Sequence, residues 1–307
     1  MKIALLLCGQ YRTLLDSKVL SYQNKFISKY NVDVFLTTWD DPGISLWDIH
    51  QKKENIYKEI TLTESELSKI KNLREFKIFN FQKFVNNLED IEFKNKLNNY
   101  IELSKFNRME KYNPIDYLTS YPQLFTIYEA NKLKRHYEKK HFFKYDIVIK
   151  SRPDFLFFQN IDFIFNLFEK DKNLVVTLNA INEYFPFRIF DVMFVSTSNN
   201  MDLLSQTFLE FKKLSKLSLL DKFKLKIGNK VAKKIESYKV FKYQSYSLKN
   251  KLLKHLKGLE ATDACRLLFK KSKKEKFKIY ELNYKIGDVI KLDHLEHGDT
   301  FSNLINF

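Results

Sequence analysis

Residues 1–40 follow the pattern of a β-α-β unit, and this pattern constrains the fold of the chain more than any other feature. Residues 2–8 form a near-continuous apolar run, which is typical of an inner strand of a parallel sheet. A second apolar strand is predicted at residues 32–37. Between them, apolar residues recur at three- and four-residue spacing, as on one face of a helix: Leu15, Val19, Tyr22 and Phe26. Two strands joined by a helix imply a parallel sheet with a right-handed crossover.

Further strands and helices are predicted in the middle of the chain. The stretch Tyr145–Asp154 contains a β-branched apolar run, and residues 174–178 and 191–196 are two more runs of strand length. Ahead of them, Ser120 is predicted to cap a helix that has Pro122 in its first turn. This alternation of strands and helices predicts an α/β, Rossmann-like fold, in which helices flank a mostly parallel sheet.

Two long segments carry weaker patterns. Residues 44–118 mix charged and Phe-rich pieces without a clear period, and we interpret them as a mainly helical insertion. The insertion lies within an α/β domain that is predicted to span residues 1–210. Residues 211–307 are predicted to form a basic, mainly helical C-terminal part that packs on this domain.

The composition is that of a folded protein. With 44% hydrophobic and 16% aromatic residues, the 307-residue chain has enough apolar side chains for a packed core. Its two cysteines, Cys8 and Cys265, lie far apart and fit no metal or redox spacing. The apolar start is too short for a signal peptide, and no run is long enough to span a bilayer. These features predict a cytoplasmic protein.

The chain is strongly basic, with a formal net charge of +16 at pH 7. Such a charge favours anionic partners, namely phosphates, nucleic acid or acidic lipid. Lysines are densest in residues 212–278, where three interpretations compete: a solvated helical face, a surface that lies on an anionic inner-leaflet membrane, and a nucleic-acid surface. The sequence carries no recognisable nucleic-acid-binding module, so no nucleic-acid partner is expected.

The first candidate site is the end of the strand in Tyr145–Asp154. Pro153 lacks an N–H and restricts Arg152 to an extended backbone, so the strand is predicted to end here. Ligands of open α/β sheets bind at the carboxyl ends of the strands. Arg152 and Asp154 are residue types that suit a phosphorylated ligand, because arginine pairs with phosphate and aspartate binds a metal or a sugar hydroxyl. The alternative is an Arg152–Asp154 pair that satisfies only itself.

Two further candidates come from other parts of the chain. The loop Gly9-Gln10-Tyr11-Arg12 is neither a dinucleotide fingerprint nor a P-loop, yet its backbone amides and Arg12 suit a nucleotide. The alternative for this loop is a plain turn between strand and helix. Asp191 begins a predicted strand and is either a site carboxylate or a solvated strand-end residue.

Four short motifs follow one another along the chain: the strand Val32-Asp-Val-Phe-Leu-Thr-Thr-Trp39, Tyr121-Pro122 leading a helix with Asn131-Lys-Leu-Lys134, the strand end Tyr145-Asp-Ile-Val-Ile-Lys-Ser-Arg-Pro-Asp154, and the short strand Asp191-Val-Met-Phe194. Taken in this order, they resemble a group of bacterial sugar transferases encoded in capsule, lipooligosaccharide and O-antigen loci. Each motif is short and degenerate, and their joint order carries the resemblance.

The resemblance covers residues 1–40 and 120–210. It implies a GT-A-like fold, in which one α/β domain, here residues 1–210, binds a nucleotide-sugar at the carboxyl edge of its sheet. It also implies transfer of the sugar from a nucleoside-diphosphate sugar to a hydroxyl of a surface-glycan acceptor, either free or lipid-linked. A basic C-terminal part would hold such an enzyme at the anionic inner leaflet.

The resemblance also implies roles for the candidate residues. Gly9, Gln10 and Arg12 would bind the nucleotide, and Asp154 would hold the diphosphate or the donor sugar. Asp191 would deprotonate the acceptor hydroxyl if the reaction inverts the anomeric configuration.

Metal binding is where the chain departs from the family pattern. Many GT-A enzymes hold Mn²⁺ or Mg²⁺ with an Asp-x-Asp motif, but Arg152 stands at the first of these positions and leaves Asp154 as the single candidate ligand. Arg152 would then neutralise the leaving diphosphate itself. Two other classes stay open: a nucleotide-dependent transferase that moves a phosphoryl-type group onto polysaccharide, and a basic nucleic-acid-binding protein.

Overall fold

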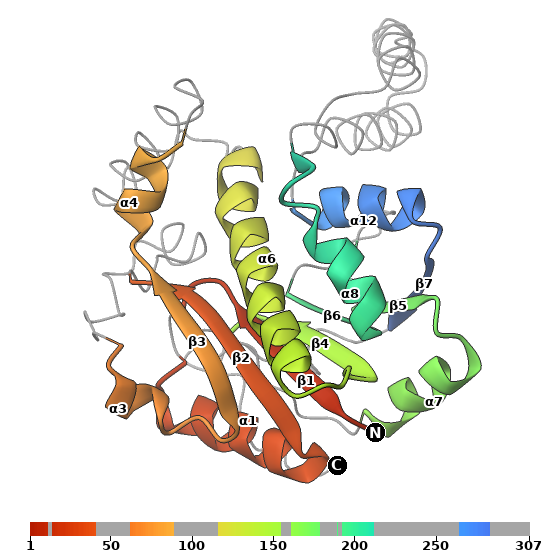
Figure 1. Ribbon diagram of the computed structural model, residues 1–307, viewed down its shortest axis with the longest axis horizontal. Helices are drawn as coiled ribbons and strands as arrows, with labels where there is room; N and C mark the ends of the chain where they lie inside the picture. The colour runs from red at the N-terminus through yellow and green to blue at the C-terminus, as the bar shows by residue number, and fades with distance from the viewer. Residues whose placement is uncertain are drawn as a thin grey trace, which may run out of the picture.

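The structure is a computed structural model that describes residues 1–11, 14–40, 62–88, 116–154, 161–178, 189, 192–211 and 264–282 (Figure 1). Its strands are β1 (Ile3–Cys8), β2 (Val32–Trp39), β3 (Leu73–Phe79), β4 (Ile147–Ser151), β5 (Leu174–Leu178), β6 (Met193–Ser196) and β7 (Lys278–Leu282). Its helices are α1 (Ser17–Tyr30), α3 (Glu64–Leu67), α4 (Phe81–Asn86), α6 (Asp116–Lys140), α7 (Asp162–Lys170), α8 (Ser198–Ser205) and α12 (Ala264–Lys274).

The described strands form one seven-stranded sheet in the order β3-β2-β1-β4-β6-β5-β7. Four of the neighbouring pairs are parallel: β1 with β2, β1 with β4, β2 with β3, and β5 with β7. β6 pairs antiparallel with both β4 and β5, so it alone among the described strands runs in the opposite direction. The prediction of a mostly parallel sheet flanked by helices is confirmed.

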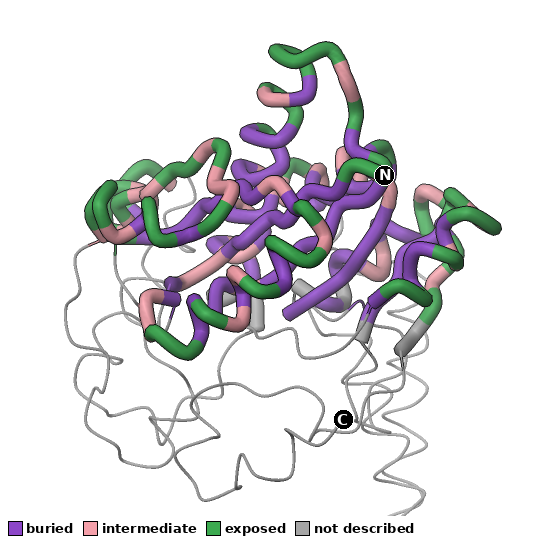
Figure 2. The backbone as a smooth tube through the Cα atoms, turned by 90° about the horizontal axis from the view of Figure 1, so that it is seen from below, coloured by how far each residue is buried: buried purple, intermediate pink, exposed green. Residues whose placement is uncertain are grey.

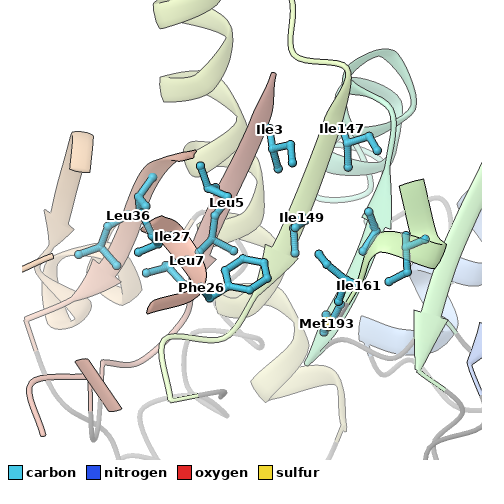
Figure 3. Packing of buried hydrophobic residues seen from close by; sticks show 14 of the residues in the cluster. Ile3, Leu5, Leu7, Phe26, Ile27, Leu36, Ile147, Ile149, Ile161 and Met193 are labelled. Carbon is cyan, nitrogen blue, oxygen red and sulfur yellow. The ribbon is translucent and has the colours of Figure 1, made fainter. Parts of the chain in front are cut away.

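Helices cover both faces of the sheet, and the alternation of side chains along β1 shows this arrangement. Ile3, Leu5 and Leu7 pack with residues of α1 and α7 on one face (Figure 3). Leu6 and its alternate neighbours on β1 pack on the other face with residues of α6, α8 and α12. All six residues of β1 are buried, as expected for a central strand between two helical layers (Figure 2).

Helix α1 shows how local sequence sets the path between β1 and β2. The side chain of Asp16 accepts hydrogen bonds from the backbone N–H groups of Lys18 and Val19, which caps the start of the helix. Asn31 ends it in the left-handed conformation, with φ 48°, and donates its N–H to the carbonyl of Ile27. The helix therefore has defined ends, and its apolar side faces the sheet as predicted.

The segment at residues 44–118, which was expected to be mainly helical, contains a strand that the sequence did not indicate. Of that segment, residues 62–88 and 116–118 are described, and residues 73–79 form strand β3 at the edge of the main sheet. Every residue of β3 is half-buried or exposed, and the strand includes Arg74, Glu75 and Lys77. An edge strand with so many charged residues lacks the apolar run by which the inner strands were predicted.

Helix α6 also begins earlier than the sequence indicated. It starts at Asp116, so Ser120 lies inside the helix and does not cap it, and Pro122 is an interior residue. The helix packs across β1 and β2, on the face of the sheet opposite to α1 and α7 (Figure 1). Thr37 of β2 donates its hydroxyl to the carbonyl of Thr126 over 2.7 Å, which fixes the helix against the sheet. The apolar side chains of Leu124, Ile127 and Leu133 in this helix are buried.

Of the predicted C-terminal part at residues 211–307, the structure describes residue 211 and residues 264–282. The latter form α12 and then β7, and β7 extends the same sheet beside β5. The sequence did not indicate this strand, which belongs to the sheet that contains β1. The division of the chain near residue 210 remains a prediction. None of the helices described here has the length and apolar character needed to cross a membrane.

Candidate functional site at the carboxyl edge of the sheet

The order of the strands creates a switch point between β1 and β4. The chain adds β2 and then β3 on one side of β1, and β4 then pairs with the opposite side of β1. The connections that leave β1 and β4 therefore diverge at the carboxyl edge of the sheet. In open α/β sheets, ligands bind in the crevice at such a point. The segments that start at Gly9 and at Arg152 are the first residues beyond these two strands.

Gly9 brings the end of β1 close to the end of β4. Its φ of +121° is a conformation that side-chain-bearing residues rarely adopt, and its N–H donates to the carbonyl of Thr37 over 3.2 Å. A Cβ built on Gly9 would lie 4.0 Å from Cδ of Pro153. The two candidate segments predicted from the sequence thus lie side by side at the same edge. Gln10 is half-buried here and Tyr11 is buried.

The segment after β4 is held from two sides. The N–H of Arg152 donates to the carbonyl of Val192 over 3.0 Å, which extends the β4–β6 ladder by one residue. The carbonyl of Pro153 accepts a hydrogen bond of 2.7 Å from Nε2 of Gln23, a buried residue of α1. β4 ends at Ser151, directly before this segment, as Pro153 predicted. Arg152 therefore starts from a fixed backbone.

Arg152 and Asp154 form a two-point ion pair with each other. Nε of Arg152 donates to Oδ1 of Asp154 over 2.9 Å, and Nη2 donates to Oδ2 over 2.5 Å. The Arg152 side chain is 17% exposed and that of Asp154 is 5% exposed. This is the contact that the self-paired alternative predicts. It also fixes the plane of the guanidinium, because a two-point pairing leaves the arginine little rotational freedom.

The described residues do not fit a divalent cation at Asp154. Both of its carboxylate oxygens accept hydrogen bonds from Arg152, and a cation would have to compete with that guanidinium at close range. In the part of the chain that the structure describes, no three His, Cys, Asp or Glu side chains gather into a metal-binding group.

Lys150 is a charged residue at this edge that the sequence reasoning did not single out. It is completely buried in β4, and it shares a face of the strand with Val148, which packs with residues of α6. Its Nζ lies 6.0 Å from the ring centroid of Phe194. Burial raises the pKa of the nearby Cys8 thiol to about 12, and the charge of Lys150 acts in the opposite direction. The signal in the sequence was a lysine inside an otherwise apolar strand.

Several motif residues of the resemblance have structural contacts. Trp39 is buried among four phenylalanine rings from β3, α4 and α6: Phe79, Phe81, Phe84 and Phe125. Asp33 accepts hydrogen bonds from Nε of Arg74 over 2.6 Å and from the hydroxyl of Tyr145 over 2.7 Å. Asp146 accepts from the N–H of Lys2 over 2.7 Å. These contacts connect β2 and β3 with the residues directly before β1 and β4. They give the motif residues Asp33, Tyr145 and Asp146 a structural role that needs no ligand.

Two of the predicted site residues, Arg12 and Asp191, lie outside the described residues. Their neighbours Tyr11 and Val192 both belong to the carboxyl edge of the sheet, Tyr11 two residues after Gly9 and Val192 beside Arg152. The structure thus brings Gly9, Gln10, Arg152 and Asp154 to one edge. No family model matches this chain, and no curated protein matches it.

Proposed function

We propose that the chain is a GT-A-like glycosyltransferase that moves a sugar from a nucleoside-diphosphate sugar to a hydroxyl of a bacterial surface glycan. One observation carries the proposal: the Gly9 segment and the Arg152–Asp154 segment meet at the switch point of a mostly parallel sheet. The order of the sequence motifs supports the choice of sugar transfer among the reactions that use such a site.

The residues of this edge have chemical properties that suit the donor. The backbone at Gly9 and Gln10, together with Arg12, would bind the nucleotide. Arg152 would stabilise the negative charge that develops on the leaving diphosphate, because a fixed cation is worth most where charge appears in the transition state. Asp191 would accept the proton of the acceptor hydroxyl in an inverting reaction. Asp154 contributes through Arg152, with which it is paired.

The acceptor and the location belong to the same proposal. A surface glycan grows on a lipid-linked or free acceptor, so the enzyme would work in the cytoplasm at the inner face of the membrane. Lysines of the C-terminal part would attract it to that anionic surface, where each is worth about 1 kcal/mol.

The experiment is an activity panel with a variant at the site. The protein is incubated with UDP-, GDP- and CMP-sugars and a glycan acceptor, and release of the nucleotide is measured. We expect release with a UDP- or a GDP-sugar and not with a CMP-sugar, which has a single phosphate, and a loss of at least about tenfold in Arg152→Gln, because a charge-assisted contact is removed. Lys132→Gln is the matched control, since the side chain of Lys132 is 47% exposed and pairs with Glu129 of the same helix.

Three results would contradict the proposal. Silence across the panel with an acceptor present favours transfer of a phosphoryl-type group. Equal activity in Arg152→Gln would place the site elsewhere. Tight binding to DNA or RNA that weakens steeply with salt would favour the nucleic-acid-binding class.

A further inference from the structure

We infer that the α6–β4 turn, residues 139–144, docks on an anionic membrane surface, with Phe142 inserted into the bilayer interface and the lysines of the turn on its phosphate headgroups. This turn belongs to the amino edge of the sheet, opposite to the candidate site. The inference goes beyond the proposed function and is independent of sugar transfer.

The backbone of Phe142 has a conformation that its residue type disfavours. Its φ is +54°, in the left-handed region where a helix end usually has glycine or asparagine. Two backbone hydrogen bonds close α6 around it. The N–H of Phe143 donates to the carbonyl of Glu138 over 3.1 Å, and that of Phe142 donates to the carbonyl of Lys139 over 3.5 Å. The helix end thus requires the conformation, but it does not require a phenylalanine.

The side chain of Phe142 lies in solvent. It is 95% exposed, more than any other large apolar side chain of the described residues. The adjacent Phe143 takes the inward position, with its ring centroid 6.1 Å from that of Tyr137 and 4.9 Å from that of Tyr145. Phe143 therefore supplies the apolar contact that such a helix end needs. Neither the helix end nor the core accounts for Phe142, which points to a contact outside the chain.

Lysines surround this exposed side chain. Lys139 and Lys140 lie in the last turn of α6, and both are exposed, as is Lys144. Nζ of Lys2 lies 3.8 Å from the ring centroid of Phe143, which places a fourth lysine beside the turn. Among the described residues, no carboxylate forms an ion pair with the three lysines of the turn.

The two carboxylates that flank the turn in sequence are already engaged. Glu138 is buried beside Lys134, and Asp146 accepts the N–H of Lys2. An apolar ring among lysines fits an anionic membrane, where the ring enters the acyl boundary and the lysines attract phosphate groups. A second copy of the chain would present the same lysines, and like charges repel each other.

This contact defines an orientation of the protein. The end of α6 and the N-terminus lie on the same side of the sheet, and this amino edge would face the membrane (Figure 1). The carboxyl edge with Gly9 and Arg152 would face water, at about 20 Å, the length of the six-residue strand β1. The candidate site would then reach acceptor hydroxyls that lie away from the bilayer surface.

The test is co-sedimentation of the full chain with vesicles of phosphatidylcholine alone, or of equal parts phosphatidylcholine and phosphatidylglycerol. We expect binding only to the anionic vesicles, and weaker binding in added salt. Phe142→Asn should weaken binding by at least about tenfold, because an inserted ring is lost. Its urea midpoint should not fall, since asparagine tolerates the left-handed conformation. Lys139→Gln/Lys140→Gln should weaken binding by about fivefold for each lysine.

Matched controls remove the same groups elsewhere. Phe163→Ser replaces a 43% exposed ring of α7, and Lys83→Gln/Lys132→Gln removes two other exposed charges. Both variants should bind as the wild type does. A Phe142→Cys variant carries an environment-sensitive dye, because Cys8 and Cys265 are buried and should stay unlabelled. Its emission should shift to the blue on anionic vesicles.

Several results would overturn the inference. Equal binding of Phe142→Asn and the wild type, or unshifted emission of the dye, would show that Phe142 does not insert. Wild-type binding by Lys139→Gln/Lys140→Gln would assign the contact to other lysines, and self-association without vesicle binding would assign the turn to a second copy. Nucleotide release without vesicle binding would remove this inference and keep the proposed function, and vesicle binding without nucleotide release would do the reverse.

Discussion

Replacing the buried Lys134 of α6 should be among the most destabilising changes in the described part of the chain. Nζ of Lys134 lies 2.5 Å from Oγ of Ser198, 2.9 Å from Oδ1 of Asp202 and 3.5 Å from Oε2 of Glu138. Its side chain is fully buried, and those of its carboxylate partners are 5% and 19% exposed. The group connects α6 to α8 and, through the Tyr145 N–H that donates to Glu138 over 2.9 Å, to the segment before β4.

Lys134→Met would remove the cation that Glu138 and Asp202 share, and Asp202 would keep the more distant Arg135, whose Nε lies 3.9 Å from its Oδ2. Loss of one member of a buried charge group costs about 3–5 kcal/mol, because the remaining charge is uncompensated. The matched control is Lys132→Met on the same helix, whose 47% exposed side chain lies 2.7 Å from Glu129. Glu129 is only 8% exposed, but it would keep a second cation, because Nζ of Lys77 lies 3.4 Å from its Oε2, so Lys132→Met should cost less than Lys134→Met. A variant that also carries Glu138→Gln and Asp202→Asn should regain part of the loss, since no buried charge is then left.

The pH dependence gives an independent signature of the same group. Burial lowers the pKa of Lys134 below that of an exposed lysine, and Asp202 and Glu138 offset this only in part. Between the lowered pKa and the ordinary lysine value of 10.5, the unfolded chain binds more protons than the folded one. The free energy of unfolding contributed by this lysine therefore rises with pH in that window, and the rise should be absent in Lys134→Met.

The assay is urea unfolding followed by circular dichroism, with the free energy of unfolding of each variant compared at pH 7 and at pH 9 to 10. The reasoning is refuted if Lys134→Met costs no more than Lys132→Met. A variant with both extra neutral substitutions that is less stable than Lys134→Met alone would refute it too.

Three further predictions follow from single contacts. Burial raises the pKa of Cys8 from 9.0 to about 12, so the thiol of a Cys265→Ser variant should react with DTNB at pH 8 only after unfolding; rapid labelling of the folded protein would contradict this. Gly9→Ala should cost about 1–2 kcal/mol from its φ of +121° alone, because the nearest atom leaves room for a methyl group; an unchanged urea midpoint would show that the backbone relaxes. Tyr145→Phe removes the 2.7 Å hydrogen bond to Asp33 and should cost about 1–2 kcal/mol in the same assay, where stability equal to the wild type would mean that the bond contributes nothing.

The inner strands could be predicted from the sequence because burial on both faces leaves a continuous apolar run. Residues 2–8, 32–37 and 174–178 all show this signal, and β5 has the predicted bounds. The helix between β1 and β2 was equally clear, because one apolar stripe faces the sheet.

Edge strands and the directions of strands could not be predicted from the sequence in this way. β3 carries charged residues on an edge and has no continuous apolar run, so its segment resembled a helical insertion. β6 is apolar enough to be recognised as a strand, yet its direction depends on the path of the chain between β5 and β6 and not on its own residues. The start of α6 was misplaced because a proline after a serine resembled a first helical turn.

The site could be located from sequence but its internal contacts could not. A proline after an apolar run correctly placed Arg152 and Asp154 at the end of a strand. Whether they face each other or a ligand depends on side-chain geometry, and the structure shows them paired. Lys150 was overlooked because a single lysine does not interrupt the apolar pattern of a strand, although its burial beside the site makes it one of the unusual residues of the fold.

The location of the bound ligand is the most direct test of the central claim, which is that an anionic ligand binds where β1 and β4 diverge. A crystal structure of the protein with the nucleoside diphosphate selected by the activity panel should show the diphosphate within hydrogen-bonding distance of Arg152 and beside the backbone at Gly9 and Gln10. A diphosphate at the opposite edge of the sheet, for example in the surface groove lined by Lys25, Lys29 and Lys71, would contradict the account.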